Sequence, residues 1–133
     1  MDTVIQNAAV LLLLLFVVIT FLQSGIDKVI DWKGILAWLK GHFSKSPLRN
    51  VVPLLLFVIT CMELIAGALS LVGFVQILNS DSFFYAELGA IIACLSLLML
   101  LFGQRIAKDY EGAKTIVIYF IPAIILVVLL QAS

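Results

Sequence analysis

Four long apolar stretches dominate the chain, and short polar connections separate them. Each stretch approaches or exceeds the roughly 20 residues that a helix needs to cross the hydrocarbon core of a bilayer. The pattern therefore predicts membrane-spanning helices at about residues 4–26, 52–78, 83–103 and 114–131. The connection NSDS at residues 79–82 is a tight turn, so the second and third spans are expected to form an antiparallel hairpin. Little chain lies outside the spans, which predicts one all-α membrane domain over residues 1–133, a four-helix bundle.

A shorter periodic stretch lies between the first two predicted spans. Apolar residues recur there at offsets that define one helical face, namely Trp32, Ile35, Leu36, Leu39 and Phe43. Lys33 and Lys40 lie off this face. We therefore expect a short amphipathic helix at about residues 32–43, lying at the membrane–water interface with its apolar face down. It could dock a cytoplasmic partner or sense lipid, or it could simply connect the two spans.

Composition and charge restrict the class of protein further. Hydrophobic residues make up 64% of the chain and charged residues 12%, against about 45–50% and about 25% in soluble domains. This excludes a water-soluble globular protein. The first span has no Lys or Arg before it and no convincing cleavage site after it, so we expect a retained helix and not a signal peptide.

All eight basic residues lie in or beside two connections, the one between spans 1 and 2 and the one between spans 3 and 4. Basic residues near the ends of spans stay on the cytoplasmic side of a membrane. The distribution predicts that both of these connections are cytoplasmic and that both termini are outside. Acidic lipid head groups account for the basic residues, so no nucleic-acid partner is expected.

One carboxylate interrupts the second span. Glu63 lies about ten residues into it, which places the side chain roughly 15 Å deep in the membrane. A carboxyl group at that depth is costly unless it faces the bundle interior and is paired or protonated. Thr60, Gly67 and Ser70 lie on the same helical face and support an inward orientation. Two interpretations stay open: Glu63 pairs with Lys28 or Arg105 as a structural lock, or it helps to bind a ligand.

Polar residues on other spans reach a similar depth. Thr20, Gln23 and Ser24 share a face near the end of the first span, and Tyr119 lies in the same half of the fourth span. Together with Glu63 they predict a polar pocket between spans 1, 2 and 4. Such a pocket could hydrogen-bond the carbonyl of a quinone or of another amphipathic ligand.

Other candidate chemistry is sparse. Cys61 and Cys94 lie at one depth on adjacent spans, so they could form a redox pair, although a buried cysteine usually behaves as a small hydrophobic residue. No spacing of His, Cys, Asp or Glu predicts a metal site, and no catalytic motif is recognisable. Catalytic residues therefore stay unassigned, and an accessory subunit is favoured over a complete enzyme.

Two segments are similar to a known family. FLQSGIDKVIDW at the end of the first span and ELIAGALSLVG in the second resemble the DoxX family of small four-helix bacterial membrane proteins. The matching positions are Gly25, Lys28, Glu63, Gly67 and Gly73. The resemblance implies a multi-pass protein of the bacterial cytoplasmic (inner) membrane, associated with quinone-linked or thiol-linked redox chemistry.

Two functional hypotheses follow. In the first, the chain is a redox-associated subunit that binds a quinone-like lipid near Glu63, with no metal or flavin of its own. In the second, it is a structural or scaffolding subunit of a membrane complex without its own chemistry. Both imply contact with membrane lipid, and both imply protein partners or a homo-oligomer.

Overall fold

The computed structural model describes residue 5, residues 7–80 and residues 82–132, and every regular element among them is helical. The elements are α2 (Ala8–Ile30), α3 (Trp32–His42), α4 (Val52–Ser80), α5 (Phe84–Ile106) and α6 (Tyr110–Gln131). All except α3 are long and apolar enough to cross a membrane. The chain is therefore a multi-pass membrane protein with a four-helix bundle, and a short extra helix follows the first span, as the predicted fold class requires.

Helices α2 and α6 extend further at the basic end of the bundle than hydropathy predicts. Helix α2 continues to Ile30, and only Asp31 separates it from α3. Helix α6 begins at Tyr110 and not at 114, because the Asp109 side chain accepts a hydrogen bond of 2.9 Å from the backbone N–H of Gly112 and caps the helix. The predicted start of the first span at residue 4 lies outside the described residues.

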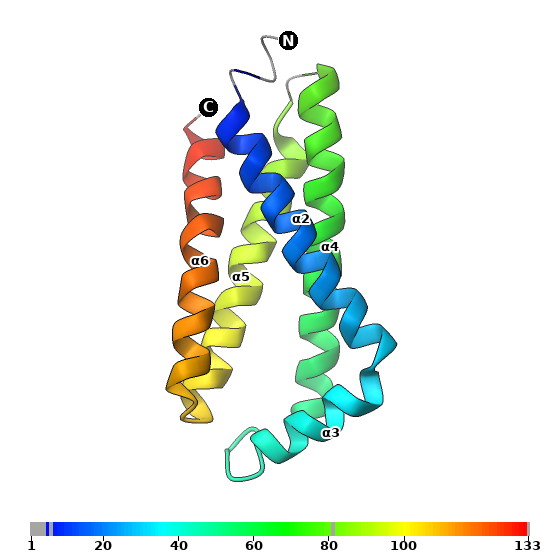
Figure 1. The fold of residues 1–133 in the computed structure, drawn as a ribbon, viewed down its shortest axis with the longest axis vertical. Helices are drawn as coiled ribbons and strands as arrows, with labels where there is room; N and C mark the ends of the chain where they lie inside the picture. Colours follow the sequence, from blue (N-terminus) through cyan, green and yellow to red (C-terminus); the bar gives the residue numbers. More distant parts are fainter. Residues whose placement is uncertain (1–4, 6, 81, 133) are drawn as a thin grey trace.

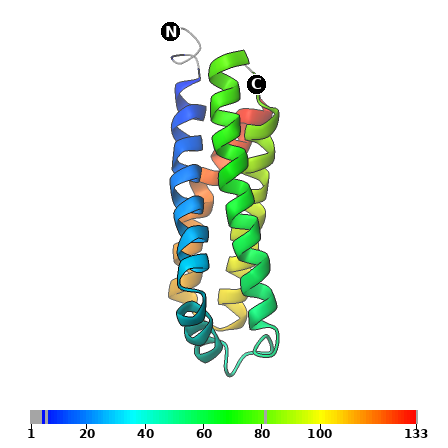
Figure 2. The ribbon, with the colours of Figure 1, turned by 90° about the vertical axis from the view of Figure 1, so that its right-hand side faces the viewer.

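Helices α4 and α5 form the most extensive helix–helix interface of the bundle. Helix α4 packs against α2 on one side and α5 on the other, and α6 packs against α5 and more lightly against α2. The first turn of α2 and the last turn of α6 lie at one end of the bundle (Figures 1 and 2). Helix α3 and the α5–α6 connection lie at the other end. The two basic connections therefore share one end of the molecule.

Small residues allow α4 and α5 to approach closely. A Cβ atom added at Gly73 would collide with the backbone of Ala86, and one added at Gly89 would collide with Ser70. A seam of small residues on α5 is buried: Ala86, Gly89, Ala90, Ala93 and Cys94. In lipid, where helices gain little from the hydrophobic effect, such close backbone packing drives their association.

The largest fully buried side chains include Leu14, Phe21, Ile77 and Leu126, which come from three different helices. Large apolar side chains also remain exposed on the outside of all four long helices. That outer surface suits contact with lipid tails, while the inner side chains fill the bundle.

We expect Gly73→Ala to destabilise the bundle, because the backbone of Ala86 cannot move aside as a flexible side chain could. Overpacking of this kind costs about 1–3 kcal/mol. The measurement is thermal unfolding of the purified protein in detergent micelles. Gly41→Ala in α3 is the matched control, since no atom lies within 4 Å of an added Cβ there. An equal loss of stability in both variants would contradict the close-packing argument.

Candidate functional site: a buried ion pair beside an apolar cavity

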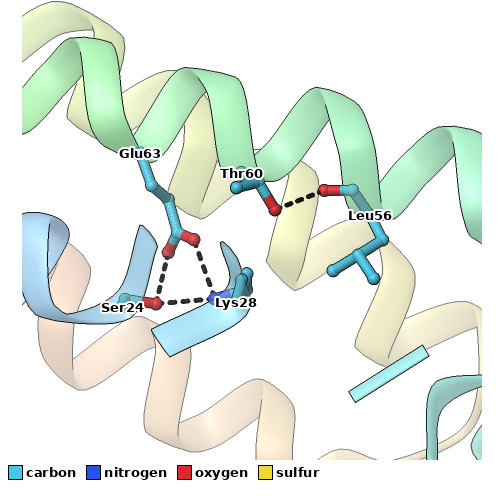
Figure 3. A network of polar contacts seen from close by, with 5 residues as sticks. All are labelled: Ser24, Lys28, Leu56, Thr60 and Glu63. Carbon is cyan, nitrogen blue, oxygen red and sulfur yellow. Dashed lines mark hydrogen bonds and ion pairs between the residues drawn. The ribbon is translucent and has the colours of Figure 1, made fainter. Parts of the chain in front are cut away.

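Glu63 makes an ion pair across the interface between α4 and α2. Its side chain is 5% exposed, and its Oε1 atom lies 2.7 Å from Nζ of Lys28. The Ser24 hydroxyl donates to Oε2 of Glu63 at 2.8 Å and accepts from Nζ of Lys28 at 2.6 Å (Figure 3). The contact at Oε1 is an ion pair, so attraction between the two charges holds this atom. We call Ser24, Lys28 and Glu63 the ion-pair network.

Two glycines bring α2 and α4 close enough for this network. A Cβ added at Gly25 would lie 2.6 Å from the side chain of Leu64, and one added at Gly67 would lie 2.6 Å from that of Leu22. Each helix thus accepts a leucine of the other over a glycine. The two contacts form on neighbouring turns around Glu63, so the packing holds the carboxylate against Lys28.

The polar stripe predicted on the second span faces inward. Thr60, Glu63, Gly67 and Ser70 are all buried. The Thr60 hydroxyl donates to the backbone carbonyl of Leu56 at 2.7 Å, one turn earlier on the same helix (Figure 3). Within the part of the chain that the structure describes, Oγ of Ser70 is buried without a hydrogen-bond partner. Of the stripe, only Glu63 makes polar side-chain contacts to another helix.

The other predicted pocket residues make no recorded polar contact with this network in the part of the chain that the structure describes. Thr20 is half-buried and Gln23 is exposed, although both lie on α2 beside Ser24. Tyr119 is 38% exposed and stacks on Phe16 with ring centroids 6.3 Å apart. Tyr119 lies away from Glu63 because α6 packs against α5 and α2 and makes no close contact with α4.

The alternative ionic partner considered for Glu63 is engaged elsewhere. The guanidinium of Arg105 lies over the ring of Tyr110, 5.2 Å from its centroid, at the α5–α6 connection. This position favours a cation–π contact with the ring. The ion pair of Glu63 is therefore made with Lys28.

A cavity of about 910 Å³ adjoins the ion-pair network at the basic end of the bundle. Its walls are apolar and come from α3, α4 and α5, with Leu39, Ile59 and Leu98 as examples. Its polar lining consists of Ser24, Asp27, Lys28 and Gln104. Figure 1 shows α4 and α5 separating towards the end that α3 crosses, which is the region that these residues enclose.

Sequence reasoning missed the contribution of α3 and α5 to this cavity. The periodicity predicts that the apolar face of residues 32–43 lies on the membrane surface. In the structure, Ile35, Leu39 and Phe43 of this face line the cavity. The sequence signal for this contribution is the apolar face itself, formed by Trp32, Ile35, Leu36, Leu39 and Phe43. Periodicity identifies such a face but does not indicate whether lipid or protein covers it.

The electrostatics of the polar end favour a neutral ligand. Lys28 and Glu63 have opposite charges, and exposed Asp27 adds one negative charge at the rim. A lysine ammonium group has three protons to donate. Ser24 and Glu63 take at most two of them, and no third acceptor lies among the described residues. One donor of Lys28, a residue of the cavity lining, therefore has no acceptor among the described residues.

Neither thiols nor metal ligands form a centre in the part of the chain that the structure describes. Cys61 is half-buried and Cys94 is buried, and both are free thiols. Their predicted redox pairing stays a prediction. No group of three His, Cys, Asp or Glu side chains that could hold a metal ion occurs among residue 5, residues 7–80 and residues 82–132.

Comparison with family models, with curated proteins and with solved structures finds no match to this chain. The DoxX resemblance therefore stays a prediction. The structure does show what its motif positions do here. Lys28 and Glu63 pair with each other, whereas Gly25, Gly67 and Gly73 allow close helix packing.

We expect removal of either charge of the ion pair to destabilise the bundle more than removal of both. Lys28→Met leaves a buried carboxylate, and Glu63→Leu leaves a largely buried ammonium group. Breaking one partner of a buried pair costs about 3–5 kcal/mol, whereas an apolar replacement of both is often tolerated. Unfolding of the two single variants and the double variant in micelles measures the coupling. Lys33→Met, at an exposed position of α3, controls for loss of charge. Additive losses in the double variant would contradict a structural ion pair.

Proposed function

We propose that this chain binds a neutral, quinone-like lipid in the cavity and acts as a DoxX-like, redox-associated subunit. One observation carries the proposal: a cavity of about 910 Å³ is apolar over most of its surface and ends at an ammonium group with an unused donor. An amphipathic molecule with a polar head and an apolar tail matches that distribution. Ligand sites in proteins typically measure about 300–1,000 Å³ and combine apolar walls with a few placed polar groups.

The tail of such a lipid would lie along the apolar walls. Leu55 and Ile59 of α4 and Leu95 and Leu98 of α5 offer aliphatic surface. Trp38 of α3 also lines the cavity and offers a flat aromatic surface for a planar ring. The opening between these helices suits a lipid that exchanges with the surrounding bilayer.

The head group would meet Lys28. A carbonyl oxygen accepts the remaining ammonium proton without bringing in a charge. An anionic head group gains little, because Glu63 already balances Lys28 and Asp27 lies at the rim. This arrangement supports a neutral acceptor such as a quinone carbonyl over a phosphate or a carboxylate.

The redox role and the orientation belong to the same proposal. A quinone carries two electrons, so a subunit that binds one would exchange them with a separate protein partner or with a second copy of this chain. The DoxX resemblance supports that association.

The positive charge at the α3 end supports an orientation with this end in the cytoplasm, across the bacterial cytoplasmic membrane. The cavity would then open in the cytoplasmic half of the bilayer.

Filling the cavity should remove the lipid without unfolding the protein. We expect Leu55→Trp to abolish stoichiometric quinone in organic extracts of gently purified protein, because Leu55 lines the cavity. Leu54→Trp is the matched control, since Leu54, the neighbour of Leu55 in the sequence, is 61% exposed and lies outside the lining. Mass spectrometry of the extracts is the measurement. Equal lipid content in both variants would contradict the assignment, and no lipid in wild-type protein would favour the structural subunit.

Changing the charge balance should change which lipid is bound. Glu63→Gln keeps the shape of the side chain but leaves the Lys28 charge unbalanced. We expect the folded variant to retain less neutral quinone and to acquire anionic lipids, such as fatty acids, in the same extracts. Glu87→Gln, another carboxylate-to-amide change but at the other end of the bundle, is the control. A variant with unchanged lipid classes would contradict head-group recognition by Lys28.

A further inference from the structure

Helix α3 closes one side of the cavity but is itself lightly held. Ile35, Trp38, Leu39 and Phe43 line the cavity from α3 and the residue that follows it. No residue of α3 is buried, in contrast to each of the four long helices. Among the described elements its backbone approaches α2 and α4, while α5 forms the opposite wall of the cavity. A wall of this kind can move without disturbing the bundle.

Side-chain contacts of His42 join the end of α3 to the α5–α6 connection. Its Nε2 atom lies 3.0 Å from Oε1 of Gln104 and 3.4 Å from Oδ2 of Asp109. The tautomer with a proton on Nε2 fits both acceptors. The imidazole also stacks on Trp38, with centroids 4.7 Å apart and planes at 14°. The contact with Gln104 links residues that are 62 positions apart in the sequence.

The partners of His42 are themselves held in place. Asp109 caps α6 through Gly112, so its carboxylate has a fixed position. Gln104 belongs to α5 and lines the cavity. His42 therefore attaches a lightly packed helix to a rigid part of the bundle.

Both ends of α3 allow it to pivot. Asp31, the single residue between α2 and α3, has non-helical backbone angles, with φ at −112° and ψ at 44°. Residues 44–51 after α3 form turns and bends and no regular element. When the His42 contacts break, the end of α3 that carries Trp38 and Leu39 loses its polar attachment to α5, and the Phe43 ring remains beside Gly103.

We propose that α3 is a lid over the cavity and that His42 is its latch to Gln104 and Asp109. Opening the latch widens the cavity at the basic end, and a lipid then exchanges faster than through the side that faces the bilayer. A few polar contacts at a surface open far more often than a packed helix interface unfolds. That the exchanged molecule is a quinone-like lipid rests on the proposed function, whereas the lid itself rests on the geometry of α3.

The first test measures opening without any ligand. In a Cys61→Ala/Cys94→Ala background, Ile59→Cys places a thiol on the cavity wall at a position that is 7% exposed, and N-ethylmaleimide labels it in nanodiscs. We expect His42→Phe, which keeps an aromatic ring beside Trp38, to raise the labelling rate about tenfold, the effect of losing one to two hydrogen bonds. Gln104→Leu should do the same, and the two changes combined should add little. Lys40→Ala, an exposed position on α3, should leave the rate unchanged.

Hydrogen exchange in the same samples separates lid opening from general loosening. Amides of residues 32–43 should exchange faster in the His42 and Gln104 variants, while those of α4 and α5 stay at the wild-type rate. Labelling and exchange that match wild type in both variants would overturn the lid. Faster exchange throughout α4 and α5 would also overturn it, because His42 would then stabilise the whole bundle.

The second test adds a decyl-substituted benzoquinone and follows quenching of Trp38 in a Trp32→Phe background. With a latch, the association and release rates both rise several-fold in His42→Phe, while the dissociation constant changes little. A weaker affinity with an unchanged association rate would overturn the lid in favour of direct ligand contact. If no variant binds the quinone but labelling of Ile59→Cys still accelerates, the lid stands and the proposed function is wrong.

Discussion

The structure depends on the need to neutralise a carboxylate inside an apolar bundle. Glu63 can be buried there in its charged form only if a positive charge reaches it, and Lys28 supplies that charge from α2. The two helices must then approach closely, which Gly25 and Gly67 permit. Helix α2 must also remain regular as far as Lys28, so the first turn into α3 cannot come before that residue. The position of α3, and with it the wall of the cavity, follows from this one pairing.

The bundle is tight where α4 meets α5 over small residues and open where α3 crosses its end. Gly73 and Gly89 draw α4 and α5 together in the half nearest the termini. In the other half, leucine and methionine side chains such as Leu98 and Met99 line a cavity. The same pair of helices therefore supplies both the firmest contact of the fold and two walls of its candidate site. Rigid packing at one end can hold the cavity open at the other.

Hydropathy and periodicity predicted the helices and the inward face of Glu63, because both depend on local spacing. They could not predict the neighbours of each helix. Depth in the membrane alone predicts Tyr119 beside Glu63. In the structure, α6, which carries Tyr119, packs against α5 and α2, whereas Glu63 lies on α4. Depth also does not distinguish Lys28 from Arg105 as the partner of Glu63. The rotation of each helix about its own axis decides which of the two side chains can reach the carboxylate. The cavity was missed because its walls come from four helices whose arrangement no single segment encodes.

The helices of this bundle are unequal in length, and a bilayer of one thickness must accommodate them all. Helix α4 has 29 residues and α6 has 22, which correspond to about 44 and 33 Å. A hydrocarbon core of about 30 Å matches α6 but not α4. Because Glu63 fixes the first half of α4 to α2, the surplus falls at its other end, where Gln76, Asn79 and Ser80 replace apolar residues. The last turns of α4 therefore stand among the lipid head groups, and hydrophobic mismatch is relieved by protrusion on one side of the membrane.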